Sequence, residues 1–260
     1  MKNIFTLALL ATCLFSLSVF SQNYVAQYNS VSNGGFAVLF SSTLYIPENG
    51  NKSFLIDYTQ RKEVEEKEET IDFDADGNPI YSVTIDSGHS KELFIFDANE
   101  KTVHYNQMVG AKQFIVKDTP PQIQWNITND TREVAGKKAV KATCTFRGRN
   151  WTAWFAPDIP VYGGPWKLQG LPGLIIEAQD DTNRYAFSLS DFREVKEEIN
   201  STLPEKTAEI TLHRFCTLEE EHEEALAMQM RAHMPRDISM TTETMRDGLE
   251  LIYEWEENNK

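Results

Sequence analysis

The residues that could carry chemistry in this chain are scattered and form no familiar catalytic motif. Five histidines are present: His89, His104, His213, His222 and His233. Each could act as a general base if the fold brought it beside a Ser, Cys, Asp or Glu side chain. The sequence contains no G-x-S-x-G, S-x-x-K, H-E-x-x-H or C-x-x-C motif and no phosphate-binding glycine loop. We therefore assign no catalytic residue and no cofactor, and an enzyme with a motif-less active site is kept as an alternative.

The best metal candidate is a group of methionines and histidines near the end of an expected helix. The group comprises Met228, Met230, His233 and Met234, with His222 earlier in the same helix. Thioether and imidazole groups are suitable ligands for Cu(I). Methionine also fills gaps in helix packing, and we favour that interpretation. No metal is assigned, and a copper-binding protein is a second alternative.

A short acidic segment matches the opening of a calcium loop. Asp72, Asp74, Asp76 and Gly77 occupy the first EF-hand positions, but the twelfth position is Val83 where a bidentate carboxylate is required. The flanking residues alternate as strands do, so Asp76-Gly77 is better interpreted as a hairpin turn.

Two cysteines, Cys144 and Cys216, lie beyond the first 21 residues. They could form a disulfide in an oxidising compartment, or they could be two buried thiols, because free cysteine packs as a small apolar residue. The sequence leaves both arrangements open.

The first 21 residues are typical of an export signal. Lys2 precedes an apolar run, and small residues at the end of that run predict cleavage before Gln22. Lipoprotein processing at Cys13 is the alternative. Removal of residues 1–21 changes the formal net charge from −14 to −15, which argues against nucleic acid or an anionic membrane as a partner. No later apolar run is long enough to cross a bilayer, so we expect an exported chain without a transmembrane segment, either periplasmic or associated with the outer membrane, with an extracellular location as the alternative.

The remaining chain reads as short strands separated by turns, with helices only near its end. Strand alternation over 138–146 places Val140, Ala142, Cys144 and Phe146 on one face. A capping-box pattern predicts a helix over 217–233, and helical spacing predicts another over 243–256. We expect a mainly β, β-rich α+β fold: a single antiparallel curved or half-barrel sheet at 22–200 and a helical segment at 201–260 packed on it.

An apolar stretch rich in glycine and proline, the Gly-Pro segment (residues 163–175), interrupts these strands. Its backbone path is set by a group of small, cyclic and aliphatic residues: Gly163, Gly164, Pro165, Gly170, Leu171, Pro172, Gly173, Leu174 and Ile175. We expect no acid or base from its side chains and favour a structural plug against the sheet. In the competing interpretation, Trp151, Trp154, Trp166 and Pro172 line an apolar pocket. Trp151 and Trp154 are three residues apart, which places them on opposite faces of a regular strand.

The same region resembles the GLPGLI family of secreted proteins from the Bacteroidota. The hexapeptide stands intact at 170–175, and the approaches at 154–160 and 163–166 are also similar, so that the resemblance extends over 125–192. The resemblance implies an exported, β-rich, envelope-associated protein with an open sheet such as lipoprotein carriers use, and it brings no catalytic residues. The expected function is therefore a non-enzymatic binding or accessory protein, with an apolar groove for an apolar ligand, a peptide or an envelope protein.

Overall fold

The structure is a computed structural model that describes residues 23–33, 37–47, 52–58, 72–73, 79–80, 91–196, 202–233, 246 and 248–257. Several sequence expectations lie partly or wholly outside these residues. They include the export signal at 1–21, the calcium-loop positions 74, 76 and 77, the candidate base His89, the candidate ligand Met234 and part of the helix expected at 243–256.

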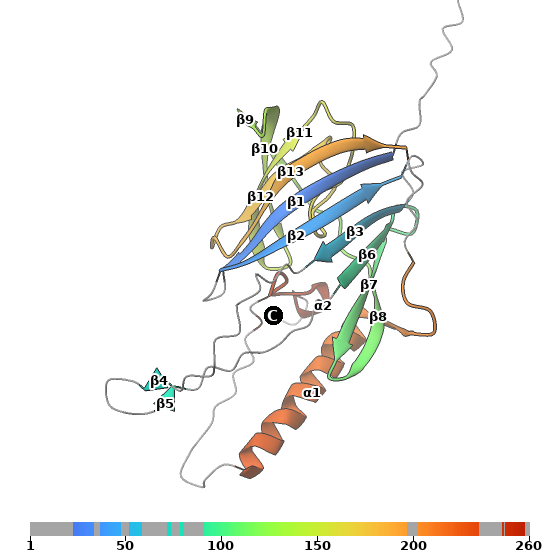
Figure 1. The fold of residues 1–260 in the computed structure, drawn as a ribbon, viewed down its shortest axis with the longest axis vertical. Helices are drawn as coiled ribbons and strands as arrows, with labels where there is room; N and C mark the ends of the chain where they lie inside the picture. The colour runs from blue at the N-terminus through green and yellow to red at the C-terminus, as the bar shows by residue number, and fades with distance from the viewer. Residues whose placement is uncertain are drawn as a thin grey trace, which may run out of the picture.

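Strands make up most of the described chain, and one long helix follows them (Figure 1). The strands are β1 (Asn23–Asn33), β2 (Ala37–Ile46), β3 (Lys52–Tyr58), β4 (Asp72–Phe73), β5 (Pro79–Ile80), β6 (Lys91–Asp97), β7 (Thr102–Val109), β8 (Lys112–Asp118), β9 (Asn126–Val134), β10 (Lys137–Phe146), β11 (Arg149–Ala156), β12 (Leu174–Asp180), β13 (Tyr185–Val195) and β14 (Ala208–Thr211). The helices are α1 (Leu212–His233) and the single turn α2 (Glu254–Glu257).

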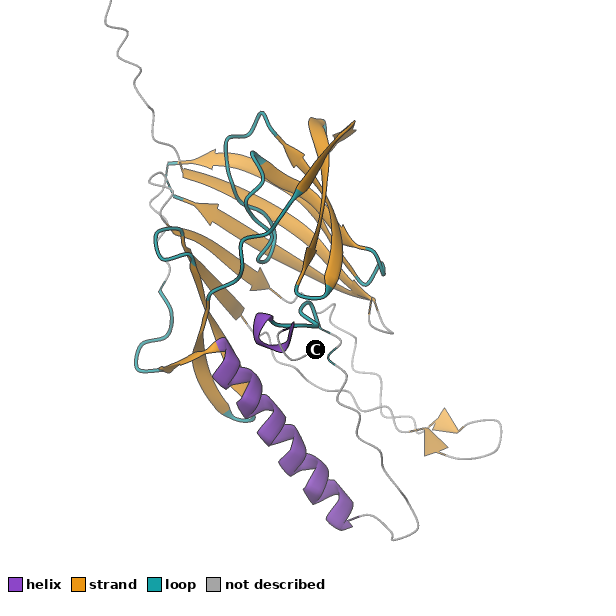
Figure 2. Cartoon of the chain, turned by 180° about the vertical axis from the view of Figure 1, so that it is seen from behind, coloured by secondary structure: helices purple, strands orange, loops and turns teal. Residues whose placement is uncertain are grey.

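Twelve strands form one sheet in the order β14-β8-β7-β6-β3-β2-β1-β13-β12-β11-β10-β9. Neighbouring strands are antiparallel except that β14 pairs with β8 in parallel. The sheet is strongly curved, and α1 extends away from it beyond the β7–β8 hairpin (Figures 1 and 2). The predicted fold class, a curved antiparallel sheet with helices at the C-terminal end, is confirmed. The short pair β4–β5 stands apart and supports the hairpin interpretation of the acidic segment.

One face of the sheet, which we call the inner face, packs against the core. In β11 every second residue is buried: Trp151, Ala153 and Phe155. Trp154 faces the other way and is half-buried, so the prediction of opposite faces for the two tryptophans is confirmed.

The alternation predicted for β10 holds at its end but fails at its start. Ala142, Cys144 and Phe146 are buried, whereas Ala139 takes the buried position expected for Val140. The register between β10 and β9 shifts between Val140 and Ala142, and such a bulge moves the preceding side chains to the opposite face.

The Gly-Pro segment lies against the inner face. The Ile175 amide donates to the Gly163 carbonyl at 3.0 Å, and the buried Tyr28 hydroxyl donates to the Ile175 carbonyl at 2.8 Å. Leu168 and Leu171 are fully buried and belong to the core formed by β1, β2, β6–β8 and β10–β13. These contacts are those of the structural plug.

Two glycines of this segment are required by close contacts. A Cβ at Gly164 would lie 2.5 Å from the Leu168 carbonyl oxygen, and a Cβ at Gly173 would lie 2.3 Å from the Ala156 carbonyl oxygen. Gly173 also has φ +148°, a conformation that side chains disfavour. No larger residue fits at either position without displacing the backbone.

The helix predictions were wrong in their bounds. α1 begins at Leu212, five residues before the predicted cap, because the Thr211 hydroxyl accepts a hydrogen bond from the Arg214 amide at 3.3 Å. Thr217 lies inside the helix, where its hydroxyl donates to the His213 carbonyl. Of the helix predicted at 243–256, only the turn from 254 is helical within the described residues, since residues 251 and 252 donate to the β10–β11 turn instead. The division at residue 200 stays a prediction, and β14 adds a strand to the segment expected to be helical.

Candidate functional site

The most unusual feature of the fold is a group of buried charges, the charge cluster (Asp118, Arg147, Lys167, Glu250 and Glu254). Asp118 ends β8, Arg147 lies in the β10–β11 turn, and Lys167 comes from the Gly-Pro segment. The two glutamates come from the C-terminal strap (residues 248–257). Arg147 and Gly148 both have positive φ, +45° and +82°, as a two-residue type I′ hairpin requires. This turn places the guanidinium group against β8.

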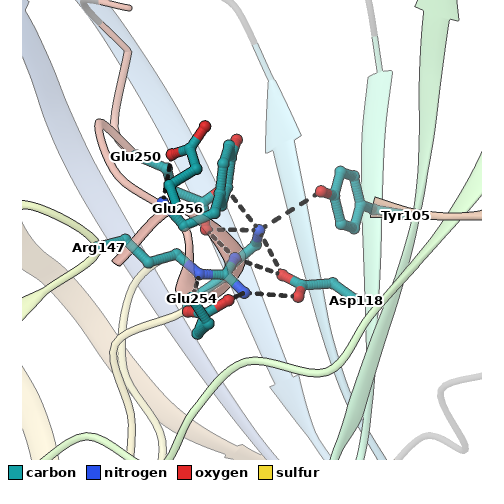
Figure 3. A network of polar contacts seen from close by, with 8 residues as sticks. Tyr105, Asp118, Arg147, Glu250, Glu254 and Glu256 are labelled. Atoms are coloured by element: carbon teal, nitrogen blue, oxygen red, sulfur yellow. Dashed lines mark hydrogen bonds and ion pairs between the residues drawn. The ribbon is translucent and has the colours of Figure 1, made fainter. Parts of the chain in front are cut away.

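Arg147 contacts Asp118, Glu250 and Glu254 (Figure 3), and Lys167 shares the first two of these carboxylates. The two terminal nitrogens of Arg147 donate to both oxygens of Asp118 at 2.8 Å, and its Nε donates to Glu254 at 2.8 Å. Arg147 also contacts Glu250. Lys167 Nζ lies 2.8 Å from Asp118 Oδ2 and 2.9 and 3.0 Å from the two oxygens of Glu250. Its ammonium group also lies 4.7 Å from the centre of the Tyr105 ring.

The centre of the cluster is buried and its charges are paired, whereas the side chain of Glu254 is 39% exposed. The side chains of Arg147, Lys167 and Asp118 are only 1–2% exposed. Burial alone would raise the pKa of Asp118, but the hydrogen bonds of Arg147 and the charge of Lys167 hold that pKa below its usual value. Burial raises the pKa of Tyr105 well above its usual value, so this phenol stays neutral. A lysine and an aspartate held in this way serve as structural charges rather than as a free base and acid.

The cluster joins the two ends of the sheet. β8 is the second strand from one end of the strand order, and β10 is the second from the other. The pair Asp118–Arg147 therefore forms only when the sheet is curved enough to bring these strands together. Lys167 links the same contact to the plug on the inner face, which corrects our expectation that the Gly-Pro segment contributes no base.

The C-terminal strap covers the cluster. The Leu251 and Ile252 amides donate to the Arg147 carbonyl at 2.9 and 3.3 Å, and Arg149 donates to the Gly248 carbonyl at 2.6 Å. A Cβ at Gly148 would lie 2.9 Å from Leu251 Cβ, so the strap lies directly on the hairpin turn.

A second buried ion pair supports the same hairpin from β12. Arg149 donates to Asp180 at 2.9 Å, and the Tyr185 amide donates to the other Asp180 oxygen at 2.7 Å. Burial would raise the pKa of Asp180, but hydrogen bonds from Thr182 and Tyr185 and the charge of Arg149 lower it.

The four residues proposed to line an apolar pocket do not meet in one cavity. The rings of Trp151 and Trp166 pack together at 5.9 Å, and both are buried. Trp154 lies on the opposite face with the Arg132 guanidinium 4.0 Å from its ring centre, and Pro172 is exposed. In this arrangement Trp151 and Trp166 offer almost no surface to a ligand, so the apolar groove stays a prediction without a cavity to support it.

The two cysteines are free and buried, so the disulfide is absent and the alternative of two thiols is the one found. Cys144 points from β10 into the core, whereas Cys216 lies in the first turns of α1. Burial raises the pKa of Cys144 to about 12. Burial also raises the pKa of Cys216, to about 11, although a hydrogen bond from Tyr253 lowers it in part.

One histidine has the partners that a catalytic base would need. His104 Nε2 lies 3.2 Å from the Thr102 hydroxyl, and its Nδ1 lies 3.2 Å from Glu209 Oε2. This is the order nucleophile, base and orienting carboxylate. Thr102 is only 5% exposed, however, and none of the three lines a hollow described below.

Two of the other candidate histidines lie in the part of the chain whose side chains the structure describes. His213 packs edge-on against Trp255, and His222 lies against Gly110. Met228 is 66% exposed on α1, and the side chains of Met230 and His233 are among those not described. Within the described residues no group of three or more His, Cys, Asp or Glu side chains could hold a metal ion. Copper binding stays a prediction.

The open surface lies on the β9–β12 half of the sheet. A hollow of about 370 Å³, the outer hollow, is lined mainly by Thr143 and Thr145 of β10 and by Asn150 and Thr152 of β11. These residues alternate with the buried ones, so the hollow is on the outer face. A smaller hollow of about 170 Å³ lies at the β9–β10 hairpin, beside Arg132 and Lys138.

Fold and site together define a class: an open, curved antiparallel sheet whose inner face is filled by its own chain and whose ends are joined by buried charges. Residues 113–177 match the model of a family described as "Protein of unknown function (Porph_ging)". The matched range includes Asp118, Arg147, Lys167 and the hexapeptide at 170–175, and it overlaps the range of the sequence resemblance. It assigns no activity, and the GLPGLI name stays an expectation. No curated protein matches the chain.

Solved structures match a larger part of the chain than the family model does. A structure of PNGF-II in space group P21 has a TM-score of 0.51 and 13% identity, covering 77% of this chain and 34% of that one. A second PNGF-II structure, in space group C2, has a TM-score of 0.50 and 13% identity, covering 77% and 33%. This chain thus spans about a third of PNGF-II, and the similarity is one of fold alone. A putative outer membrane lipoprotein-sorting protein domain from Vibrio parahaemolyticus, with 10% identity over 68% of this chain and 87% of that one, has a TM-score of 0.26, too low to support an inference.

The charge cluster was missed by sequence reasoning. The usable signal was Lys167 between Trp166 and Leu168, a lone cation in an apolar stretch that must be buried. A buried lysine needs carboxylate partners. Nothing local identifies them, because Asp118 and Glu250 lie 49 and 83 residues away along the chain.

Proposed function

We propose that the chain is an exported, non-enzymatic binding or accessory protein of the cell envelope, and that it binds through the outer face of β9–β12. The observation that carries the proposal is the outer hollow, which is open to a ligand, whereas the inner face is filled. The inner face is filled by the Gly-Pro segment, whereas the outer hollow of about 370 Å³ stands on the three strands β9, β10 and β11. The export signal expected at 1–21 supports the location. No helix among the described residues has the length and apolar character needed to cross a membrane.

The test is native mass spectrometry of the chain purified from its own envelope fraction. We expect a non-covalent mass on the wild type, its loss in Thr152→Trp, and its retention in Ser188→Trp. Thr152 lines the outer hollow, so an indole there fills it. Ser188 is exposed on β13 and does not line the outer hollow, which makes it the matched control. A bare chain in the wild type, or a mass that survives Thr152→Trp, would overturn the proposal.

A hydrolase is the second candidate, because the contacts of Thr102, His104 and Glu209 have the order of a catalytic triad. Its test is hydrolysis of a panel of p-nitrophenyl esters by the wild type and by Thr102→Ala and His104→Ala. Turnover that both substitutions abolish, with unchanged melting temperature, would favour the hydrolase over the binding protein.

A further inference from the structure

We propose that the outer hollow is a binding site for a neutral, hydroxyl-rich ligand, that is, a saccharide. This inference rests on the proposed function and assigns the ligand class of the same surface. It starts from the groups that line the hollow. Three carry side-chain amides, Gln124, Asn126 and Asn150, and three carry hydroxyls, Thr143, Thr145 and Thr152. Cys144 and Trp151 also line the hollow, but both residues are buried and belong to the core. Asp181 supplies the one carboxylate.

The lining selects against other ligand classes. No lysine or arginine lines the hollow, so an anion would find no counter-charge there. Within the described residues no group of three or more His, Cys, Asp or Glu side chains could hold a metal ion, and the hollow has a single carboxylate. An apolar ligand would bury amides and hydroxyls without partners, which is unfavourable. Amide and hydroxyl groups both donate and accept hydrogen bonds, as sugar hydroxyls do, and this match is the chemical basis of the assignment.

Part of the lining is held in place before any ligand arrives. The Thr145 hydroxyl donates to Asn150 Oδ1 at 2.7 Å, and Asn150 Nδ2 donates to Asp181 Oδ2 at 2.9 Å. The Asp181 amide also donates to the Asn150 carbonyl at 3.0 Å. These bonds fix the side chains of Asn150 and Asp181, which lowers the entropy lost when a ligand is bound.

Strand register arranges the polar groups in two rows across the sheet. Thr145 stands opposite Asn150 in one row, and Thr143 stands opposite Thr152 in the next. Asn126 extends the second row onto β9, opposite Thr143. Side chains in such rows are about 4.5–5.5 Å apart across neighbouring strands. A volume of about 370 Å³ lies within the range of small-molecule sites, about 300–1,000 Å³. The hollow can therefore hold a short stretch of a glycan across three strands.

The experiment is binding of the fluorescently labelled, mature full-length chain to an array of neutral, sialylated and sulfated oligosaccharides. We expect binding to at least one neutral class and weaker or no binding to the charged ones. Asn126→Ala and Asn150→Ala should each weaken the binding about tenfold, as loss of a ligand hydrogen bond does. Asn129→Ala is the control, because Asn129 is exposed on the same strand as Asn126 but does not line the hollow. All variants are checked by thermal unfolding.

Absence of binding to every neutral glycan would overturn the saccharide assignment, as would equal binding by Asn126→Ala and the wild type. These failures are separable from failure of the proposed function. If the native mass is lost in Thr152→Trp but contains no sugar, the binding surface stands and the ligand class is wrong. If the chain is bare and no glycan binds, both are wrong.

Discussion

Lys167→Met tests whether the charge cluster holds the fold together. The substitution keeps the length and apolar body of the side chain and removes only the charge, which is 2% exposed. Asp118 keeps its two bonds from Arg147, whereas Glu250 loses the contacts at 2.9 and 3.0 Å. Breaking one partner of a buried pair costs about 3–5 kcal/mol. Because Arg147 remains beside both carboxylates, we expect the lower end, about 3 kcal/mol.

This loss is large enough to measure. A chain of this length loses about 2–4 °C of melting temperature per kcal/mol, so the expected decrease is about 6–12 °C. Lys117→Met is the matched control, because Lys117 precedes Asp118 in the sequence but forms only an exposed pair with Glu100. This variant should lose at most about 1 kcal/mol of stability. Lys167→Met/Glu250→Gln should regain part of the loss, because the unpaired carboxylate is removed as well.

The pH dependence gives an independent test. The pKa of Asp118 is lowered in the folded state, so its contribution is present above the unfolded pKa near 3.8 and is lost as the pH falls through the folded-state pKa. Lys167→Met removes one of the two cations that lower this pKa. The contribution of Asp118 to the free energy of unfolding is therefore smaller in the variant, and less of it is lost as the pH falls. The difference between wild type and variant should be largest at pH 7 and should shrink below pH 4. A loss under about 1 kcal/mol at pH 7, or a difference independent of pH, would refute a structural role for the cluster.

Three other perturbations test separate features of the fold. Gly173→Ala should lose about 3 kcal/mol or more in thermal unfolding, because of its φ and a backbone carbonyl 2.3 Å from the new Cβ; Gly170→Ala, with φ +93° and open space, should lose about 1 kcal/mol, and equal losses would contradict the steric account. Tyr28→Phe removes a buried 2.8 Å hydrogen bond to β12 and should lower the free energy of unfolding in urea by about 1–2 kcal/mol; an unchanged midpoint would show that the bond contributes nothing. Cys144 and Cys216 should resist a thiol reagent at pH 8 in the folded chain and react after unfolding, because burial raises both pKa values; labelling of the native chain at the unfolded rate would show that they are accessible.

The sheet could be predicted from the sequence, because its information is local. Alternation in β11 depends on neighbouring residues, and it places Trp151 and Trp154 on opposite faces as predicted. The bulge in β10 broke the alternation at Val140, since a bulge depends on the partner strand rather than on the strand itself. The helix expected at 243–256 failed for a tertiary reason: Leu251 and Ile252 donate to the Arg147 carbonyl instead of to their own turn.

The candidate site was harder to predict than the fold. The outer hollow combines polar side chains from β9 and the residues before it with others from β10, β11 and the β12–β13 turn, and these polar residues are ordinary exposed or half-buried ones. The sequence interpretation placed the pocket at tryptophans instead, and Trp151 and Trp166 are core residues. Size and apolar character predict burial more directly than they predict ligand binding.

The charge cluster and the outer hollow are linked through the shape of the sheet. A buried ion pair is weak support for stability, because desolvation offsets much of its attraction, but its geometry is demanding. Asp118 and Arg147 can pair only at one curvature of the sheet, and Lys167 pairs with the same carboxylate only when the Gly-Pro segment is seated. An apolar contact would tolerate a range of curvatures, since hydrophobic attraction has no direction. The cluster therefore fixes the β10–β11 hairpin from the inner face, and Asn150 and Thr152 on that hairpin present the polar rows on the outer face. The glycines and prolines of the segment supply the path that brings Lys167 to this contact.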